Sequence, residues 1–198
     1  MSLKRDFLFM VLLVGSEGSG KSYLQKRFVR NFFSLELHPT TGMHHAIKNI
    51  EVYEKNVQIQ IWDPPGREEF KPALASYIQR FQSILLVYDI TDKSSFEEIS
   101  NWYSFVASNR NLENLSFFLI GTKSDLKSSR KVSFDEGQEL ANKLGMYFME
   151  ISGNNRHNLD TLFKFMCGIL VSQKIENISA KIQMKLLKRQ KRKNTSWF

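Results

Sequence analysis

A glycine-rich loop between an apolar run and an amphipathic run constrains this chain more than any other stretch. Residues 7–14 form a continuous apolar run that predicts a buried strand, and residues 23–31 have the spacing of a helix. Between them, residues 15–22 read Gly-Ser-Glu-Gly-Ser-Gly-Lys-Ser. A strand, this glycine pattern and a helix in succession predict a phosphate-binding P-loop rather than an ordinary glycine turn.

Each residue type in this loop suits the binding of phosphate. The glycines let the backbone curl so that its N–H groups point inward, where they bind phosphate oxygens. Lys21 brings a cation to the β- and γ-phosphates, and the Ser22 hydroxyl suits Mg²⁺. The helix that follows adds the positive end of its dipole. The predicted phosphate-binding residues of the loop are Gly15, Ser16, Glu17, Gly18, Ser19, Gly20, Lys21 and Ser22.

The composition indicates one globular domain with a sizeable core, because 42% of the 198 residues are hydrophobic and 13% are aromatic. The single cysteine, Cys167, excludes a disulfide framework and a cysteine zinc site. It suits a reducing compartment, so we expect a cytoplasmic protein. We find no signal peptide and no apolar run near the roughly 18 residues of a membrane span.

The net charge of +8 is concentrated at the C-terminal end. From residue 181 onward there are seven Lys or Arg and no acid, which leaves residues 1–180 close to neutral. The body therefore has no evident basic face, and we expect no nucleic-acid partner.

The remaining chain alternates strands with helices, which predicts an α/β domain with a mostly parallel sheet. Ligands bind such sheets outside the carboxyl ends of the strands. The predicted strands are residues 7–14, 43–53, 57–62, 84–88, 115–120 and 146–151. A turn at 54–56 joins the second and third strands as a hairpin. The predicted helices are residues 23–31, 96–109, 133–144 and 159–171, with a further helix entered from the loop 67–80. The last of them either ends near residue 171 or continues into the C-terminal extension. We expect Ser94 or Ser95 to cap the second of these helices, and a capping box of Ser133 and Glu136 to begin the third, which Gly145 ends.

Further motifs follow in order. Thr40-Thr41-Gly42 resembles the T-x-G of a switch I, and residues 62–66 (Trp-Asp-Pro-Pro-Gly) resemble the W-D-T-A-G of a switch II. Residues 88–96 fit Y-D-x-T-x-x-x-S-F, and residues 122–125 (Thr-Lys-Ser-Asp) resemble N/T-K-x-D. With the P-loop, these motifs make residues 6–172 similar to a small GTPase of the Ras superfamily, closest to the Rab branch.

The resemblance implies a P-loop NTPase fold: a small G-domain over residues 1–172, with a six-stranded, mostly parallel sheet flanked by about five helices. It implies GTP or GDP bound with Mg²⁺, and a Gly66 N–H that meets the γ-phosphate. The implied metal ligands are Ser22, Thr40 and Asp63. The implied guanine-binding residues are Phe33, Thr122, Lys123, Asp125, Ser152, Gly153 and Asn154. A carboxylate at Asp125 would accept both N–H donors of guanine, a pair that adenine lacks. The resemblance also implies a monomer that binds effectors and regulators through residues 32–45 and 63–80, in vesicle or membrane trafficking.

Two residues, one after Gly66 and one in the P-loop, depart from this pattern where the resemblance implies catalysis. Arg67 stands where the family usually has the glutamine that orients the attacking water, and arginine has no carbonyl acceptor. Glu17 places a carboxylate where the family tolerates glycine or a small residue near the γ-phosphate. We therefore expect slow GTP hydrolysis. The alternative is that Arg67 swings out and Glu68 positions the water.

A rival hypothesis is a pseudo-GTPase interaction scaffold that is constitutively GTP-bound or nucleotide-free. Glu17, Arg67 and Asn154, which replaces a lysine of the family, favour it. The intact Lys21 and Asp63 argue against a loss of nucleotide binding. An ATP-using P-loop enzyme is a third, weaker hypothesis, which the carboxylate in the N/T-K-x-D motif disfavours.

Residues 173–198 are interpreted as a basic amphipathic C-terminal extension. Their apolar residues Ile175, Ile178, Ile182 and Leu186 share one helical stripe among lysines. No cysteine follows Cys167, so we expect no prenylation by the usual route. The stripe suits peripheral contact with an anionic membrane, contact with a partner protein, or a solvated extension of the last helix.

Overall fold

One six-stranded sheet forms the centre of the molecule in the computed structural model, which describes residues 5–30, 42–152 and 156–194. The strands are β1 (Phe7–Val14), β2 (His44–Val52), β3 (Lys55–Asp63), β4 (Ser83–Asp89), β5 (Ser116–Thr122) and β6 (Tyr147–Glu150). Their order across the sheet is β2-β3-β1-β4-β5-β6, and every neighbouring pair is parallel except the β2–β3 hairpin. This confirms the predicted mostly parallel sheet and its hairpin.

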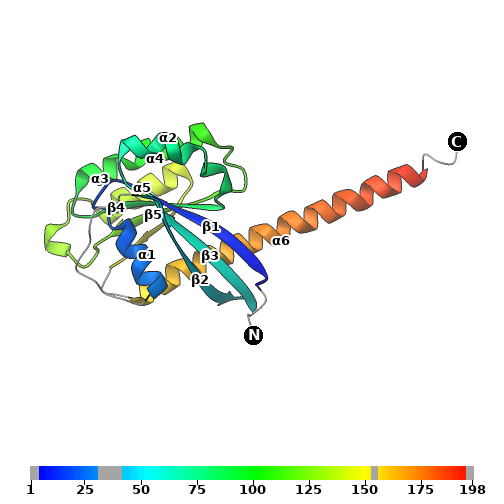
Figure 1. Cartoon of the computed structure of the whole chain (residues 1–198), viewed down its shortest axis with the longest axis horizontal. Helices are drawn as coiled ribbons and strands as arrows, with labels where there is room; N and C mark the ends of the chain where they lie inside the picture. Colours follow the sequence, from blue (N-terminus) through cyan, green and yellow to red (C-terminus); the bar gives the residue numbers. More distant parts are fainter. Residues whose placement is uncertain (1–4, 31–41, 153–155, 195–198) are drawn as a thin grey trace.

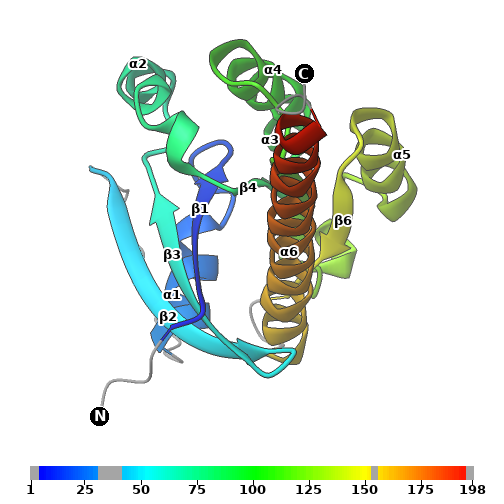
Figure 2. The same ribbon diagram turned by 90° about the vertical axis from the view of Figure 1, so that its right-hand side faces the viewer.

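The helices cover both faces of the sheet (Figures 1 and 2). They are α1 (Lys21–Arg30), α2 (Lys71–Ala75), α3 (Lys93–Glu97), α4 (Ile99–Asn109), α5 (Phe134–Leu144) and α6 (Arg156–Asn194). Short 3-10 turns occupy Glu68–Phe70, Ile78–Arg80 and Lys127–Ser129. Apolar side chains of α1 and α6 pack on one face, and those of α2, α4 and α5 pack on the other. The result is a three-layer α/β domain with a core on each side of the sheet.

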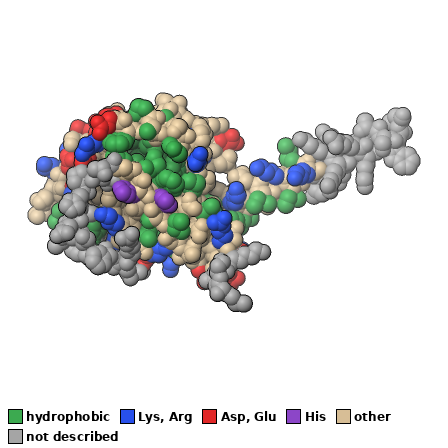
Figure 3. All heavy atoms as spheres, in the orientation of Figure 1, with side chains coloured by type: hydrophobic (Ala, Val, Ile, Leu, Met, Phe, Trp, Pro, Cys, Tyr) green, Lys and Arg blue, Asp and Glu red, His purple; other side chains and the backbone are tan. Residues whose placement is uncertain are grey.

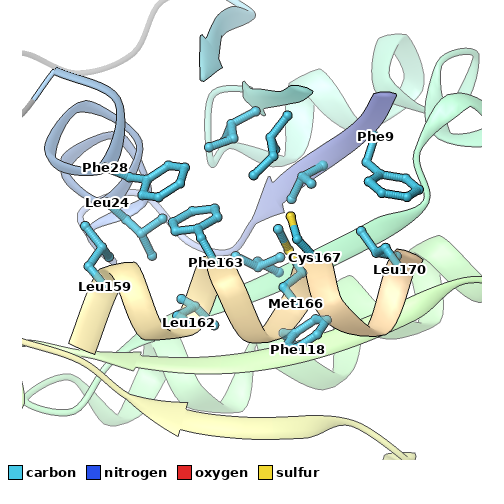
Figure 4. Packing of buried hydrophobic residues seen from close by; sticks show 14 of the residues in the cluster. Phe9, Leu24, Phe28, Phe118, Leu159, Leu162, Phe163, Met166, Cys167 and Leu170 are labelled. Carbon is cyan, nitrogen blue, oxygen red and sulfur yellow. The ribbon is translucent and has the colours of Figure 1, made fainter. Parts of the chain in front are cut away.

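The central strands are buried on both faces, as their continuous apolar runs predict. All seven residues of β4 and all seven of β5 are buried. On the α1–α6 side, the rings of Phe28 and Phe163 stack with centroids 3.6 Å apart, and Met166 and Cys167 lie further along α6 in the same core (Figure 4). Burial of this kind is the main stabilising contribution to such a fold.

The turn of the β2–β3 hairpin is two residues long, where three were predicted, and it begins one residue earlier. Lys55 and Asn56 already pair with Val52 and Glu51, so the turn consists of Tyr53 and Glu54. Both have positive φ, 51° and 58°, which a tight two-residue hairpin turn requires. The sequence lacks the glycine that usually signals such a turn, which explains the displaced prediction.

The predicted cap at Ser94 or Ser95 is wrong. Asp92 caps α3, because its carboxylate accepts hydrogen bonds from the Ser94 N–H at 3.1 Å and from the Ser94 hydroxyl at 2.8 Å. The Ser95 hydroxyl is buried and accepts a 3.0 Å hydrogen bond from the Asp89 N–H. The predicted helix 96–109 is two helices, α3 and α4, which meet at Glu98.

The capping box and the glycine stop of α5 are confirmed. The Ser133 hydroxyl accepts from the Glu136 N–H, the Glu136 carboxylate accepts from the Ser133 N–H, and Gly145 ends the helix at φ 67°. The last helix extends beyond 159–171 into the C-terminal extension, which is the longer of the two predicted alternatives. It continues as one α6 from Arg156 to Asn194 and projects from the body (Figure 1).

Candidate functional site

The motif residues gather at the carboxyl edge of the sheet, where ligands of parallel α/β sheets bind. The P-loop follows β1, and Asp63 ends β3. Asp89 ends β4, Thr122 ends β5 and Ser152 follows β6. The parallel arrangement therefore brings together residues up to 137 positions apart in the sequence.

The P-loop has the backbone that its glycines allow. Gly15, Gly18 and Gly20 have positive φ of 142°, 78° and 94°, a region that residues with a side chain rarely adopt. A Cβ on Gly15 would lie 2.1 Å from the Val87 carbonyl oxygen, so no larger residue fits there. The loop therefore curls tightly against β4.

Lys21 lies inside this curl and is 5% exposed. Its Nζ donates to the carbonyl oxygens of Gly15 at 2.8 Å and of Ser16 at 2.7 Å. Burial lowers the pKa of Lys21 to about 8, although the carboxylates of Asp63 and Glu17 oppose the shift. The ammonium group is thus held at the centre of the loop, where an anionic ligand would compensate its buried charge.

Asp63 and Ser22 form the candidate metal site. Asp63 is 2% exposed, and burial raises the pKa of its carboxyl, although a hydrogen bond with Ser22 and the nearby Lys21 ammonium act in the opposite direction. Its Oδ1 atom is buried and has no hydrogen-bond partner among the described residues. Mg²⁺ prefers carboxylate and hydroxyl oxygens, so this donor set fits the ion that the motifs imply.

Gly66 contacts the P-loop directly. A Cβ at this position would lie 2.6 Å from the Gly15 carbonyl oxygen, 2.6 Å from Lys21 Nζ and 2.7 Å from the Glu17 nitrogen. The backbone that begins switch II therefore packs against the loop and its lysine. Only glycine permits this approach, since any side chain would overlap with backbone atoms.

Arg67 and Glu17 form an ion pair. From the sequence, the two residues had been predicted only as separate departures from the family pattern. Arg67 Nε donates to Glu17 Oε2 at 3.1 Å, and its Nη2 donates to Oε1 at 3.4 Å. About half of each side chain is exposed, and Glu69 Oε1 lies 3.7 Å from Arg67 Nη1. The hydrogen bond with Glu17 raises the pKa of the Arg67 guanidinium, and the charge of the Glu17 carboxylate acts in the same direction.

Thr122 connects three parts of the site. Its hydroxyl lies 2.7 Å from the Ser19 carbonyl oxygen and 3.0 Å from that of Tyr88, and all three residues are buried. The methyl and hydroxyl groups also pack beneath Gly20. Thr122 therefore fastens the P-loop to the ends of β4 and β5.

The remaining residues of the N/T-K-x-D motif lie beside it. Lys123 has a positive φ of 60°, and its Nζ lies 2.5 Å from Asp89 Oδ2. Burial acts to raise the pKa of Asp89, but hydrogen bonds from Lys123 and Thr91 outweigh it and the pKa is lowered. Asp125 accepts a 2.6 Å hydrogen bond from the Ser152 hydroxyl, so the loop after the last strand contacts this motif.

Four predicted site residues lie outside the residues that the structure describes: Phe33, Thr40, Gly153 and Asn154. The sequence prediction of the site residues omitted Asp89, which contributes to the site. It binds Lys123 and holds Thr91, and its position at the end of a buried strand was the available signal.

Comparisons with known proteins find a matching family and several relatives of this chain. Residues 10–171 match the Ras family. The Ras-related protein SEC4 of Candida albicans is 37% identical over 171 residues, which cover 86% of this chain and 81% of the relative. The GTP-binding protein ypt2 of Schizosaccharomyces pombe is 39% identical over 171 residues, covering 86% of this chain and 85% of the relative. The Ras-related protein RABA6b of Arabidopsis thaliana is 39% identical over 163 residues, covering 82% and 71%.

Proposed function

Because the chain belongs to the Ras family of small GTPases, on its Rab branch, we propose that it is a molecular switch that binds GTP and GDP with Mg²⁺. The observation that carries this proposal is the buried Lys21 ammonium inside the P-loop, next to an Asp63 oxygen without a partner among the described residues. A nucleotide phosphate and a cation would satisfy these two groups together.

We assign the phosphate contacts to Lys21, the Gly66 N–H and the P-loop backbone. Ser22 and Asp63 hold Mg²⁺, with Thr40 as a further ligand. The bound ion supplies charge neutralisation for the phosphate oxygens. Asp125 accepts from the guanine base, and the Ser152 hydroxyl orients its carboxylate through the 2.6 Å hydrogen bond. The other assigned base contacts are Phe33, Thr122, Lys123, Gly153 and Asn154.

Members of the family hydrolyse GTP, and we propose that this chain does so slowly. Arg67 replaces the water-orienting glutamine, and its guanidinium binds Glu17, with Glu69 nearby. A guanidinium only donates hydrogen bonds, so it cannot accept one from the attacking water. A single-turnover assay of bound GTP tests this point. An Arg67→Gln variant should hydrolyse the GTP faster than the wild type. Equal rates would contradict the proposal.

The nucleotide test uses fluorescent GDP and the purified full chain. We expect GDP and GTP to compete for the site and ADP and ATP to fail. Asp125→Ala should lose the preference for guanine, while Asp135→Ala, an exposed aspartate on α5, should keep it. Failure of every nucleotide to bind in the presence of Mg²⁺ would instead favour the pseudo-GTPase scaffold.

Switch residues 32–45 and 63–80 are the proposed surface for effectors and regulators, and vesicle trafficking is the proposed process. The C-terminal part of α6 is the proposed site of peripheral membrane contact. Ile175, Ile178 and Ile182 are about half exposed along it, and lysines follow the opposite edge (Figure 3). An anionic bilayer suits this combination of charge and apolar surface, with a protein partner as the alternative. Among the described residues, none of the helices has the length and apolar character to cross a bilayer.

A further inference from the structure

We infer that the Glu17–Arg67 ion pair is a clasp that makes the nucleotide site prefer a diphosphate over a triphosphate. This inference rests on the proposed function, because it concerns the terminal phosphate of the same nucleotide. It concerns the binding of GTP relative to GDP, which is separate from the rate of hydrolysis.

The clasp joins two segments that the γ-phosphate has to separate. Glu17 lies on the P-loop, and Arg67 is the first residue after the Gly66 that packs on Lys21. An ideal Cβ on Gly66 falls within 2.7 Å of both Lys21 Nζ and the Glu17 nitrogen, so the two segments touch with no group between them. A phosphate that accepts from the Lys21 ammonium and from the Gly66 N–H has to lie between these donors. GTP binding therefore requires the segment at Gly66 to move away from the P-loop.

That movement breaks the bidentate contact between Arg67 and Glu17. The preceding residues offer little compensation, because Pro64 and Pro65 are both buried and each has a fixed φ. The backbone change falls mainly on Gly66 and the residues after it. Once the pair is broken, the carboxylate of Glu17 remains on the P-loop beside the additional negative charge of the γ-phosphate. GDP has no γ-phosphate and leaves the clasp closed.

The test is the ratio of the dissociation constants for GDP and for a non-hydrolysable GTP analogue. It is measured on the full chain with Mg²⁺ for the wild type, Glu17→Gln, Arg67→Gln and the double variant. Both pair members are exposed, so these substitutions leave the fold intact. Each single variant should shift the ratio toward the triphosphate by about two- to fivefold, the range for an exposed ion pair.

The sign of the Arg67→Gln effect is decisive. Removal of a positive charge from a phosphate site ordinarily weakens the binding of the more negative nucleotide, whereas loss of the clasp strengthens it. In the Glu17→Gln background, Arg67→Gln should no longer favour the triphosphate, because no pair is left to break. Glu69→Gln is the matched control: it neutralises the other carboxylate beside Arg67, 3.7 Å away, and should change the ratio less than twofold.

The outcomes separate the two proposals. If the wild type binds GDP but Arg67→Gln favours the diphosphate or acts equally in both backgrounds, the clasp is wrong and the guanine-nucleotide switch stands. If the wild type binds no guanine nucleotide, the clasp and the proposed function both fail.

Discussion

Replacing Thr122 with valine removes the hydroxyl that fastens the P-loop to the sheet and keeps the branched shape of the side chain. The hydroxyl lies 2.7 Å from the Ser19 carbonyl oxygen and 3.0 Å from the Tyr88 carbonyl oxygen, and Thr122 itself is 6% exposed. Valine would leave a buried carbonyl oxygen without its donor and would press a methyl group against it. The cost of such a buried unsatisfied group is about 1–3 kcal/mol.

The cost should appear in two measurements. Urea unfolding of the nucleotide-free Thr122→Val protein should give a free energy of unfolding lower by about 2 kcal/mol. The loosened P-loop should also release fluorescent GDP faster, by about tenfold if 1.4 kcal/mol of the loss is expressed in binding.

Thr122→Ser is the control, because it retains the hydroxyl and loses the methyl group. It should remain within about 1 kcal/mol of the wild type and release GDP at a similar rate. If serine and valine destabilise the protein equally, the hydroxyl contributes nothing. The account of Thr122 as the link between Ser19 and Tyr88 would then be refuted.

Three further predictions concern stability. In the nucleotide-free protein, the free energy of unfolding should rise between pH 8 and 9 by up to about 1 kcal/mol, because the pKa of Lys21 falls from 10.5 to about 8 on folding and the unfolded chain binds the extra proton; Lys21→Met should remove this rise in pH-dependent urea titrations. Phe163→Ala should cost about 3–5 kcal/mol in the same assay because its ring is buried and stacked, while Phe165→Ala, 46% exposed on the same helix, should cost much less. Gly145→Ala should lower the free energy of unfolding by about 1–2 kcal/mol, because the residue has φ 67°. Gly145→Asn should cost less, because asparagine tolerates this φ better.

The pH window of the Lys21 prediction is narrow for a physical reason. Burial raises the pKa of Cys167 to about 12 and also raises the pKa of Tyr88. The folded protein therefore retains protons that the unfolded chain loses around pH 9.0 from the thiol and around pH 10.0 from the phenol, which lowers stability with rising pH. Below pH 9 the Lys21 contribution should dominate the slope.

Much of the fold could be predicted because its signals are local. The continuous apolar runs that became β4 and β5 reflect burial on both faces, and Ser133 with Glu136 forms a capping box within one turn. The cap at Asp92 was missed because serine and aspartate compete for the same role, and only the backbone decides between them.

The candidate site could be located from sequence but its internal contacts could not. Glycine spacing predicted the P-loop, whose glycines have positive φ in the structure, and the ends of the strands indicated that Asp63 and Thr122 lie beside it. The pairing of Glu17 with Arg67 joins residues 50 positions apart, and no local pattern records such a contact. Thr122 was predicted as a residue beside the base, and no sequence signal indicated that its buried hydroxyl also fastens the P-loop.

Because α6 is one continuous helix, it fixes the direction in which its C-terminal part extends from the domain, and it changes the distance spanned very little. Hydrogen bonds to the body hold the helix at Gln173 and Asn177. The following residues, 178–194, extend about 25 Å at the helical rise. A flexible linker of the same length would span roughly 23 Å, but with no fixed orientation. Whatever binds the far end of α6 therefore sets the angle at which the switch surface is presented. Since the helix is rigid, binding at its far end also fixes the orientation of the domain.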